Sequence, residues 1–254
     1  MAIFHSCSFI GIRSEQQDRF VVLENAIMSG DLLVILCDGH NVDGAWCAEQ
    51  ACNLLASGIS QRNPFVQEDI VQLFCEVDEF ICKDKKIKGG TTATMLYIMP
   101  ERAMVANVGD SPALLTGIRD RYTFLHTDHS MENPSELKRM EDLGYTVSRS
   151  YFQQPNRKAP KGLNISRALG DAHMKPGVIA TPDVAIIEGR LRGAALVIAS
   201  DGILLCRTQL MGCLAGRSTF ARRALVSEGI IGAACLHDNS TAVMVDLKGY
   251  YARQ

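Results

Sequence analysis

Three short apolar runs in this 254-residue chain each end in an aspartate, and this feature limits the possible folds more than any other. The runs are VILC, VANVG and LVIAS at residues 34–37, 105–109 and 196–200, and they are followed by Asp38, Asp110 and Asp201. Each has the length and apolar character of a buried strand. A fourth aspartate, Asp238, comes just before the run 240–247, which predicts a last strand. If these strand ends lie side by side, the carboxylates gather at one edge of the sheet structure.

The rest of the chain alternates between groups of strands and pairs of helices. Alternating or β-branched runs predict strands at 3–10, 19–24, 31–37, two or three between 90 and 115, and at 183–188, 194–199 and 240–247. A 3.6-residue period predicts helices at 43–57, 67–83, 133–144 and 218–228. No linker or repeat divides the sequence, so we expect one domain over residues 1–254 of the α+β class, with helices covering antiparallel sheets.

Composition excludes several classes of protein. Hydrophobic residues make up 47% and charged residues 21%, which is typical of a folded globular chain. The balance of 26 basic and 28 acidic residues argues against nucleic acid as a partner. We expect no membrane span, because the chain has no apolar run of about 18 residues. The first residues lack the pattern of a secretory signal, and the nine cysteines form no C-x-x-C pair, so we expect a reducing cytoplasmic or nuclear location.

Several carboxylates brought close together could not all stay ionised without a compensating cation. Oxygen ligands with no Cys or His cluster favour hard divalent ions such as Mg²⁺ or Mn²⁺. A pair of such ions lowers the pKa of a bound water and neutralises phosphoryl oxygens, and phosphoester hydrolysis is the natural use of that chemistry. The alternative for each single aspartate is turn chemistry, because Asp-Gly commonly follows a strand.

Nine segments, in this order, resemble the metal-dependent protein phosphatases of the PP2C (PPM) family. They are R-S-E-Q-Q-D (13–18), C-D-G-H (37–40), G-G-T-T-A (89–93), A-N-V-G-D-S (106–111), T-D-H (127–129), S-R-A-L-G-D (166–171), A-T-P-D-V (180–184), A-S-D-G-I (199–203) and D-N-S-T-A-V (238–243). The resemblance covers nearly the whole chain. It implies a fold of two packed antiparallel β-sheets flanked by helix pairs, an αββα sandwich.

The resemblance also implies a role for each matching residue. Asp38 corresponds to the carboxylate that bridges two metal ions, Gly39 binds one of them through its carbonyl, and Asp201 and Asp238 complete the ligands of the other. Asp18 corresponds to the residue that holds metal-bound water, and Arg13 to the phosphate-binding arginine. His40 corresponds to the histidine proposed to protonate the leaving alkoxide. Asp110 matches an aspartate associated with a third, weaker metal site, while His129 is assigned a structural role.

The chain departs from the family pattern at several places. Leu205 stands where an acidic residue is common, which implies a weakened third metal site. The loop D-G-H-N-V-D-G after Asp38 is longer than the usual D-G-H-G-G, although Asn41 can adopt a positive φ. The polar stretch 146–164 corresponds to the family's flap, and Arg149, Arg157, Lys158 and Lys161 within it could attract an acidic phosphopeptide. A solvated loop explains these charges equally well.

The sequence therefore predicts a monomeric hydrolase of phosphoric monoesters that acts on phosphoserine and phosphothreonine in phosphoproteins. The resemblance implies direct attack by a water that bridges two Mg²⁺ or Mn²⁺ ions, with no phosphoenzyme. Two alternatives stay open. One is a pseudophosphatase that acts as a binding or scaffold protein, which the Leu205 and loop departures favour. The other is a phosphatase for small phosphorylated metabolites.

Overall fold

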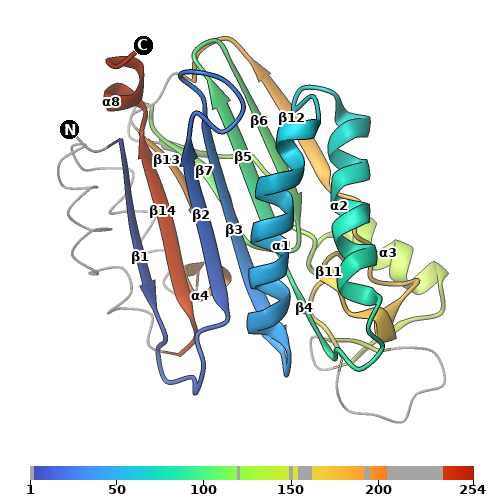
Figure 1. Cartoon of the computed structure of the whole chain (residues 1–254). Helices are drawn as coiled ribbons and strands as arrows, with labels where there is room; N and C mark the ends of the chain where they lie inside the picture. Colours follow the sequence, from blue (N-terminus) through green and yellow to red (C-terminus); the bar gives the residue numbers. More distant parts are fainter. Residues whose placement is uncertain (1–2, 119–120, 149–150, 154–161, 192–194, 205–236) are drawn as a thin grey trace.

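The computed structural model describes residues 3–118, 121–148, 151–153, 162–191, 195–204 and 237–254. Two antiparallel sheets pack face to face, with helices on the outer face of one of them (Figure 1). The α+β class and the two-sheet architecture expected from the sequence are confirmed. The predicted helix at 218–228, Leu205 and the four basic residues of the flap lie outside the described residues.

The larger sheet has the order β11-β4-β3-β5-β6-β12, with β2 paired to β3. Its strands are β2 (Asp18–Glu24), β3 (Leu32–Asn41), β4 (Gly89–Thr91), β5 (Ala93–Met99), β6 (Arg102–Val108), β11 (Leu169–Gly170) and β12 (Asp183–Glu188). Two helices cover its outer face, α1 (Gly44–Gly58) and α2 (Gln67–Cys82) (Figure 1). A 3-10 turn, η1 (Ile59–Gln61), connects α1 to the segment before α2.

The second sheet has the order β1-β14-β13-β7-β8. Its strands are β1 (Phe4–Phe9), β7 (Ala113–Ile118), β8 (Arg121–Phe124), β13 (Ala195–Ala199) and β14 (Ser240–Asp246). The remaining elements are α3 (Pro134–Asp142), the hairpin of β9 (Thr146–Ser148) and β10 (Tyr151–Gln153), η2 (Ala172–Met174), α4 (Asp201–Leu204) and α8 (Leu247–Tyr251). Among the helices that the structure describes, none combines the length and apolar character of a transmembrane span.

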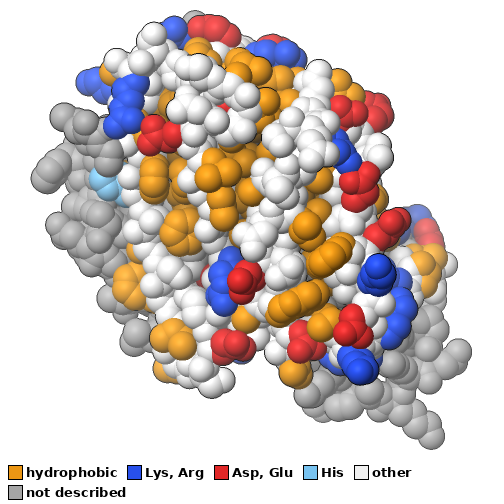
Figure 2. Space-filling model, in the orientation of Figure 1, with side chains coloured by type: hydrophobic (Ala, Val, Ile, Leu, Met, Phe, Trp, Pro, Cys, Tyr) orange, Lys and Arg blue, Asp and Glu red, His pale blue; other side chains and the backbone are white. Residues whose placement is uncertain are grey.

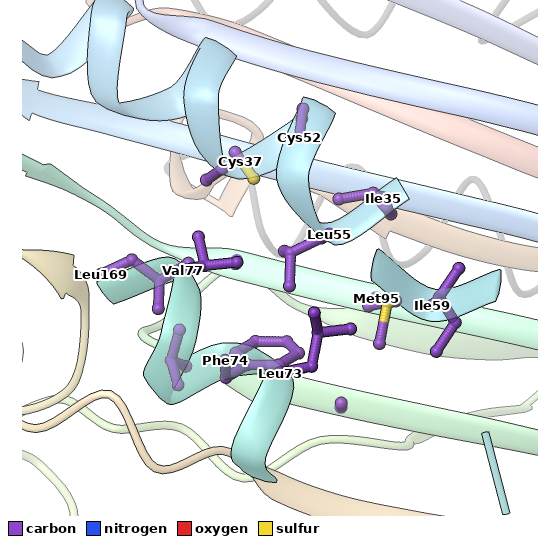
Figure 3. Close-up of a cluster of buried hydrophobic side chains, with 14 of the residues drawn as sticks. Ile35, Cys37, Cys52, Leu55, Ile59, Leu73, Phe74, Val77, Met95 and Leu169 are labelled. Carbon is purple, nitrogen blue, oxygen red and sulfur yellow. The ribbon is translucent and has the colours of Figure 1, made fainter. Parts of the chain in front are cut away.

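Strand β3 is apolar from Leu32 to Cys37 because both of its faces are buried over these residues. Alternate residues of a strand point to opposite faces. Leu33, Ile35 and Cys37 pack in the core beneath α1 and α2, as Figure 3 shows for Ile35 and Cys37, which lie near Cys52 and Leu55 of α1. Leu32, Val34 and Leu36 belong instead to the core between the two sheets.

One boundary of β3 differs from the sequence prediction. We expect a strand that ends before Asp38, but β3 continues to Asn41. It pairs with β5 from Leu32 to Leu36 and then with β4 from Gly39 to Asn41, so Asp38 lies where the pairing changes. The continuous apolar run stops at Cys37, which is why the sequence does not reveal that the strand extends to Asn41. The strand ends at Asn41, where φ is +65°.

The face of the molecule that carries α1 and α2 is mixed in charge. Figure 2 shows acidic and basic side chains interspersed over its described part, with hydrophobic side chains between them. This distribution matches the near balance of 26 basic and 28 acidic residues in the sequence.

Replacing Phe74 by Ala tests the core beneath α2. Phe74 is fully buried on the inner face of this helix. The substitution is expected to lower the free energy of unfolding by about 3–5 kcal/mol, because it leaves a cavity the surroundings fill only in part. Phe80, on the same helix, is 48% exposed. Phe80→Ala is therefore the control, with a change within about 0.5 kcal/mol. Urea unfolding measures both, and equal losses would contradict the packing described.

Candidate active site

All of the predicted site residues except Asp18 line one cavity of about 680 Å³. The cavity is open to solvent and lies at the lower end of the sandwich in Figure 1, where β3 continues into its pairing with β4 and α4 begins. The predicted residues that line it are Arg13, Asp38, Gly39, His40, Asp110, Asp201 and Asp238. Tyr151, Asn164 and Ile165 also line the cavity.

Strand geometry explains why Asp38 faces the other aspartates. Asp38 is an even-numbered residue of β3, so it follows Leu32, Val34 and Leu36 on the face that packs against the second sheet. In that sheet β13 and β14 are antiparallel neighbours. Asp201 comes two residues after the end of β13 and Asp238 two residues before the start of β14, so both lie at the same end. The two sheets thus bring three chain-distant carboxylates to one cavity.

Asp18 lies behind this cavity and connects the two sheets. In the β2–β3 pairing it stands directly opposite Asp38, and it is only 3% exposed. Its Oδ2 accepts a hydrogen bond of 2.8 Å from the Ser200 hydroxyl at the end of β13. The Ser200 oxygen in turn accepts a bond of 2.9 Å from the Thr241 N–H in β14. Asp18 is therefore placed to support Asp38 rather than to line the cavity.

Gly39 is held in a gap that admits no side chain. A Cβ added there would lie 2.2 Å from the carbonyl oxygen of Gly44 and 2.8 Å from that of Gln17. The Gly39 N–H donates to the same Gln17 oxygen at 3.2 Å. The backbone at Gly39 is therefore fixed between the start of α1 and the segment before β2, next to Asp38.

Burial and mutual repulsion raise the pKa values of the clustered carboxyl groups. Burial raises the pKa of Asp38 well above its usual range, and the charges of Asp18, Asp201 and Asp110 add to the effect. The pKa of Asp201 is raised by burial and then by Asp238. Burial, with Asp201 and Asp128, raises the pKa of Asp110 to about 7. A positive charge nearby would therefore stabilise the ionised form of each of these carboxyl groups.

Carboxylate and backbone carbonyl oxygens are the donors that hard divalent cations prefer, so this set of residues fits such an ion. The side chains do not form a closed cage, however. Within the described residues, no three His, Cys, Asp or Glu side chains stand together as a metal-binding cluster. Asp238 instead pairs with Arg13, with 2.6 Å between Oδ2 and Nη2. This hydrogen bond raises the pKa of Arg13.

His40 has a partner that the sequence alone does not identify. Its Nε2 lies 2.6 Å from Oδ2 of Asp171, the last residue of the S-R-A-L-G-D segment. Burial by itself lowers the pKa of His40, but the charge of Asp171 and the hydrogen bond to it outweigh burial, so the pKa is raised. The sequence alone gives Asp171 no role. The sequence signal that could point to Asp171 is an aspartate directly after Leu-Gly. An aspartate at such a position is also explained by turn formation.

A buried ionic network fixes the segment that leads to Asp171. Glu136 of α3 is almost fully buried and accepts hydrogen bonds from Arg139, Arg167 and the Ser166 hydroxyl. Burial alone would raise its pKa, but these bonds, Arg167 first, lower it to about 2. Arg167 also pairs with Asp183 at 2.8 Å. The network ties α3 to the strands and loops around the cavity.

His129 is fully buried beside the turn that carries Asp110. Its Nδ1 accepts a hydrogen bond of 3.1 Å from the Gly109 N–H, and its Nε2 lies 3.3 Å from an oxygen of Asp183. The Gly109 backbone has φ +100°, which favours glycine. This placement agrees with a structural role for His129.

Comparison with known proteins identifies the family. Residues 9–210 match the family model described as protein phosphatase 2C. The chain belongs to the protein phosphatase 2C family. Proteins of this family are metal-dependent protein phosphatases.

Curated relatives agree with this membership. A probable protein phosphatase 2C of Arabidopsis thaliana is 29% identical over 204 residues, which cover 76% of this chain and 51% of the relative. The chain thus spans about half the length of that relative. A probable protein phosphatase 2C of Oryza sativa subsp. japonica is 28% identical over 280 residues, covering 94% of this chain and 73% of the relative.

Solved structures share the fold. A serine-threonine phosphatase 2C from Toxoplasma gondii superposes with a TM-score of 0.78 at 18% identity, covering 96% of this chain and 94% of that one. A sex determining protein of C. elegans superposes with a TM-score of 0.77 at 21% identity, covering 98% of this chain and 66% of that one. At these identities the likeness concerns the protein phosphatase 2C fold.

Asp38→Asn tests the electrostatics of the cavity. With EDTA present, we expect the variant to unfold about 2–4 °C above the wild type, because about 1 kcal/mol of repulsion and desolvation is removed. Saturating Mn²⁺ should raise the unfolding temperature of the wild type, since a ligand of the folded state stabilises it, and should leave the variant nearly unchanged. Differential scanning calorimetry measures all four states.

The matched control for Asp38→Asn is Asp31→Asn. Asp31 is a buried carboxylate at the opposite end of the β2–β3 hairpin, and it accepts bonds from the Ala26, Ile27 and Met28 N–H groups and the Tyr97 hydroxyl. This variant should unfold at a lower temperature and keep the response to Mn²⁺. A wild type that shows no response to Mn²⁺ contradicts the inferred cation site.

Glu136→Gln tests the ionic network through its pH dependence. The pKa of Glu136 falls from 4.5 to about 2 on folding. As the pH drops, the unfolded chain therefore takes up the proton first, so the stability from Glu136 is present above about pH 5 and is lost between about pH 4.5 and 2. We expect the variant to be less stable at pH 7 by up to about 3 kcal/mol, and the gap to shrink over that window.

Urea unfolding at several pH values measures this gap. Glu141→Gln on the same helix is the control, because Glu141 is exposed. Its change should stay within about 0.5 kcal/mol at every pH. A gap for Glu136→Gln that does not depend on pH would show that the lost stability is steric rather than ionic.

Proposed function

We propose that this chain is a metal-dependent phosphatase that hydrolyses phosphoserine and phosphothreonine in proteins. The observation that carries the proposal is the shared cavity, which collects Asp38, Asp201 and Asp238 from three separate segments of the chain together with Arg13 and His40. Membership of the protein phosphatase 2C family supports it. The site thus contains residues for binding a cation, a phosphate and a leaving group.

Asp38, the Gly39 carbonyl, Asp201 and Asp238 would hold two Mg²⁺ or Mn²⁺ ions. When bound, such ions compensate the repelling carboxylates, neutralise a phosphoryl oxygen and lower the pKa of a water enough to make it the nucleophile. Asp18 acts from behind Asp38 and orients it or a nearby water through its own fixed position. No covalent phosphoenzyme is required.

Arg13 binds the phosphate. Its guanidinium is 56% exposed at the cavity and presents a planar set of donors that suits a phosphate dianion. Its present partner, Asp238, is 29% exposed, so the ion pair is open to solvent and contributes little stability. Arg13 can therefore exchange Asp238 for substrate at small cost, which also frees that carboxylate to bind a cation.

His40 lines the cavity two residues after Asp38 and protonates the leaving alkoxide of serine or threonine. Asp110 belongs to a third, weaker cation site on the same wall. The nearness of Asp128, whose charge contributes to the raised pKa of Asp110, supports a further positive charge there. Leu205, which replaces an acidic residue in the family pattern, weakens this site.

We also propose that the protein acts as a monomer in the cytoplasm or nucleus. The support for this location is the cysteines: Cys7, Cys37, Cys47, Cys52, Cys75 and Cys82, those that the structure describes, are all free thiols. Reduced thiols of this kind are typical of a reducing compartment.

The test is turnover of a phosphothreonine peptide with Mn²⁺. We expect hydrolysis that EDTA abolishes and that Asp201→Asn lowers by about 100-fold or more, because a ligand and its charge compensation are lost. Asp31→Asn should keep the activity per folded molecule. Faster hydrolysis of small phosphorylated metabolites than of the peptide would overturn the proposed substrate class. A folded wild type with no Mn²⁺-dependent turnover would favour a binding or scaffold protein.

A further inference from the structure

The contact between His40 and Asp171 joins two segments that are 131 residues apart in the chain. His40 is partly exposed, with 22% of its side chain accessible, and it lines the cavity. Asp171 is 1% exposed and lies behind it. The 2.6 Å separation of His40 Nε2 and Asp171 Oδ2 is a short hydrogen bond between a ring nitrogen and a carboxylate. A histidine that merely occupies the surface end of a strand does not require a buried carboxylate as its hydrogen-bond partner.

The backbone at Asp171 is strained in a way that places its carboxylate. Asp171 has φ +51° and ψ +42°, in the left-handed region that residues other than glycine adopt less readily. Gly170 before it has φ +93°. The turn is held by hydrogen bonds from the Asp171 N–H to the Gly89 oxygen at 3.0 Å and from the Met174 N–H to the Asp171 oxygen at 2.7 Å. Strain of this kind tends to persist where function requires it.

The carboxylate of Asp171 has no structural use that the described residues reveal. An aspartate in a turn ordinarily accepts a bond from a nearby backbone N–H. Here Oδ2 contacts His40, and the buried Oδ1 has no hydrogen-bond partner among the described residues. The hydrogen bonds that close the turn come from backbone groups, so the Asp171 side chain is available to bond to His40.

Gly90 provides the space for this contact. Gly90 of β4 stands opposite His40 in the β3–β4 pairing. A Cβ added there would lie 2.1 Å from Asp171 Oδ2 and 2.8 Å from His40 Nε2. Gly90 is not among the glycines with positive φ, so its backbone conformation does not require glycine. The absence of a side chain at residue 90 serves the histidine and carboxylate pair.

We propose that Asp171 is the positioning residue of His40. The hydrogen bond occupies Nε2 and fixes the ring, so that Nδ1 is the nitrogen available to the cavity. As the phosphorus–oxygen ester bond of the substrate breaks, the oxygen of the attacking water bonds to phosphorus and releases one proton to solvent, while the proton on Nδ1 passes to the leaving alkoxide, which departs as the alcohol. His40 regains a proton from solvent. This inference rests on the proposed phosphatase function.

The test compares two leaving groups in a double-mutant cycle. A serine alkoxide needs a proton to leave, whereas p-nitrophenolate leaves readily without one. With Mn²⁺ we expect Asp171→Asn to lower kcat on a phosphoserine peptide by about 10–100-fold, with KM little changed and a much smaller loss on p-nitrophenyl phosphate. Because Asp171 acts through His40, Asp171→Asn in a His40→Ala background should cause no further loss.

A second measurement does not depend on turnover. The imidazole nitrogens of His40, followed by NMR in ¹⁵N-histidine-labelled protein, should show a hydrogen-bonded Nε2–H in the wild type that is lost in Asp171→Asn. Gly90→Ala should produce the same loss by filling the space between the two groups. Asp31→Asn, which removes a buried carboxylate elsewhere, should leave the His40 signals unchanged. Thermal unfolding establishes that each variant is folded.

Several results would overturn the inference. Equal losses of kcat on both substrates, or a further loss in the His40→Ala background, would assign Asp171 a purely structural role. An unchanged Nε2–H signal in Asp171→Asn would do the same and covers a variant too weakly active to assay. A wild type that hydrolyses neither substrate, with the Nε2–H signal intact, would overturn the phosphatase function while leaving the pairing of the two residues established.

Discussion

Repulsion among carboxylates is the constraint around which this end of the molecule is built. Asp18 and Asp38 lie opposite each other in one sheet, and Asp201 and Asp238 come from the end of the other. Like charges repel each other, so they stay close together only where another interaction holds them in place. Here the force is the apolar core between the sheets, where Leu36 of β3 packs with Ile198 of β13 and Val243 of β14. The free energy of packing that core keeps the carboxylates together at the cavity, where a cation or a phosphate could bind.

Different parts of the site tolerate this strain in different ways. Asp18 is stabilised by the hydroxyl of Ser200, whereas Asp238 shares its charge with exposed Arg13. Glu136, in another network, is the opposite case, because its arginines more than compensate for burial. The Glu136 network is therefore compensated by its arginines, whereas Asp38, Asp201 and Asp110 at the cavity have raised pKa values, which is typical of functional sites.

Much of this arrangement follows from the sequence because strand alternation and turn residues are local signals. The apolar runs before Asp38, Asp110 and Asp201 locate β3, β6 and β13, and the strand expected at 183–188 is β12. The extension of β3 to Asn41 could not be predicted, because residues 38–41 are Asp, Gly, His and Asn, which do not continue the apolar run. The partner of His40 was also hidden, since contact between residues 131 positions apart depends on how β4 and β11 pair.

The change of pairing within β3 has a consequence for how this chain can vary. Asp38 is fixed from both sides, by Asp18 across β2 and by the Thr92 N–H, which donates to the Asp38 carbonyl oxygen at 2.9 Å. The loop of Val42 and Asp43 begins only after β3 has completed its pairing with β4 at Asn41. Additional residues in that loop can therefore alter the rim of the cavity without moving the carboxylate at its base. Recognition at the rim and chemistry at the base are thus free to evolve separately.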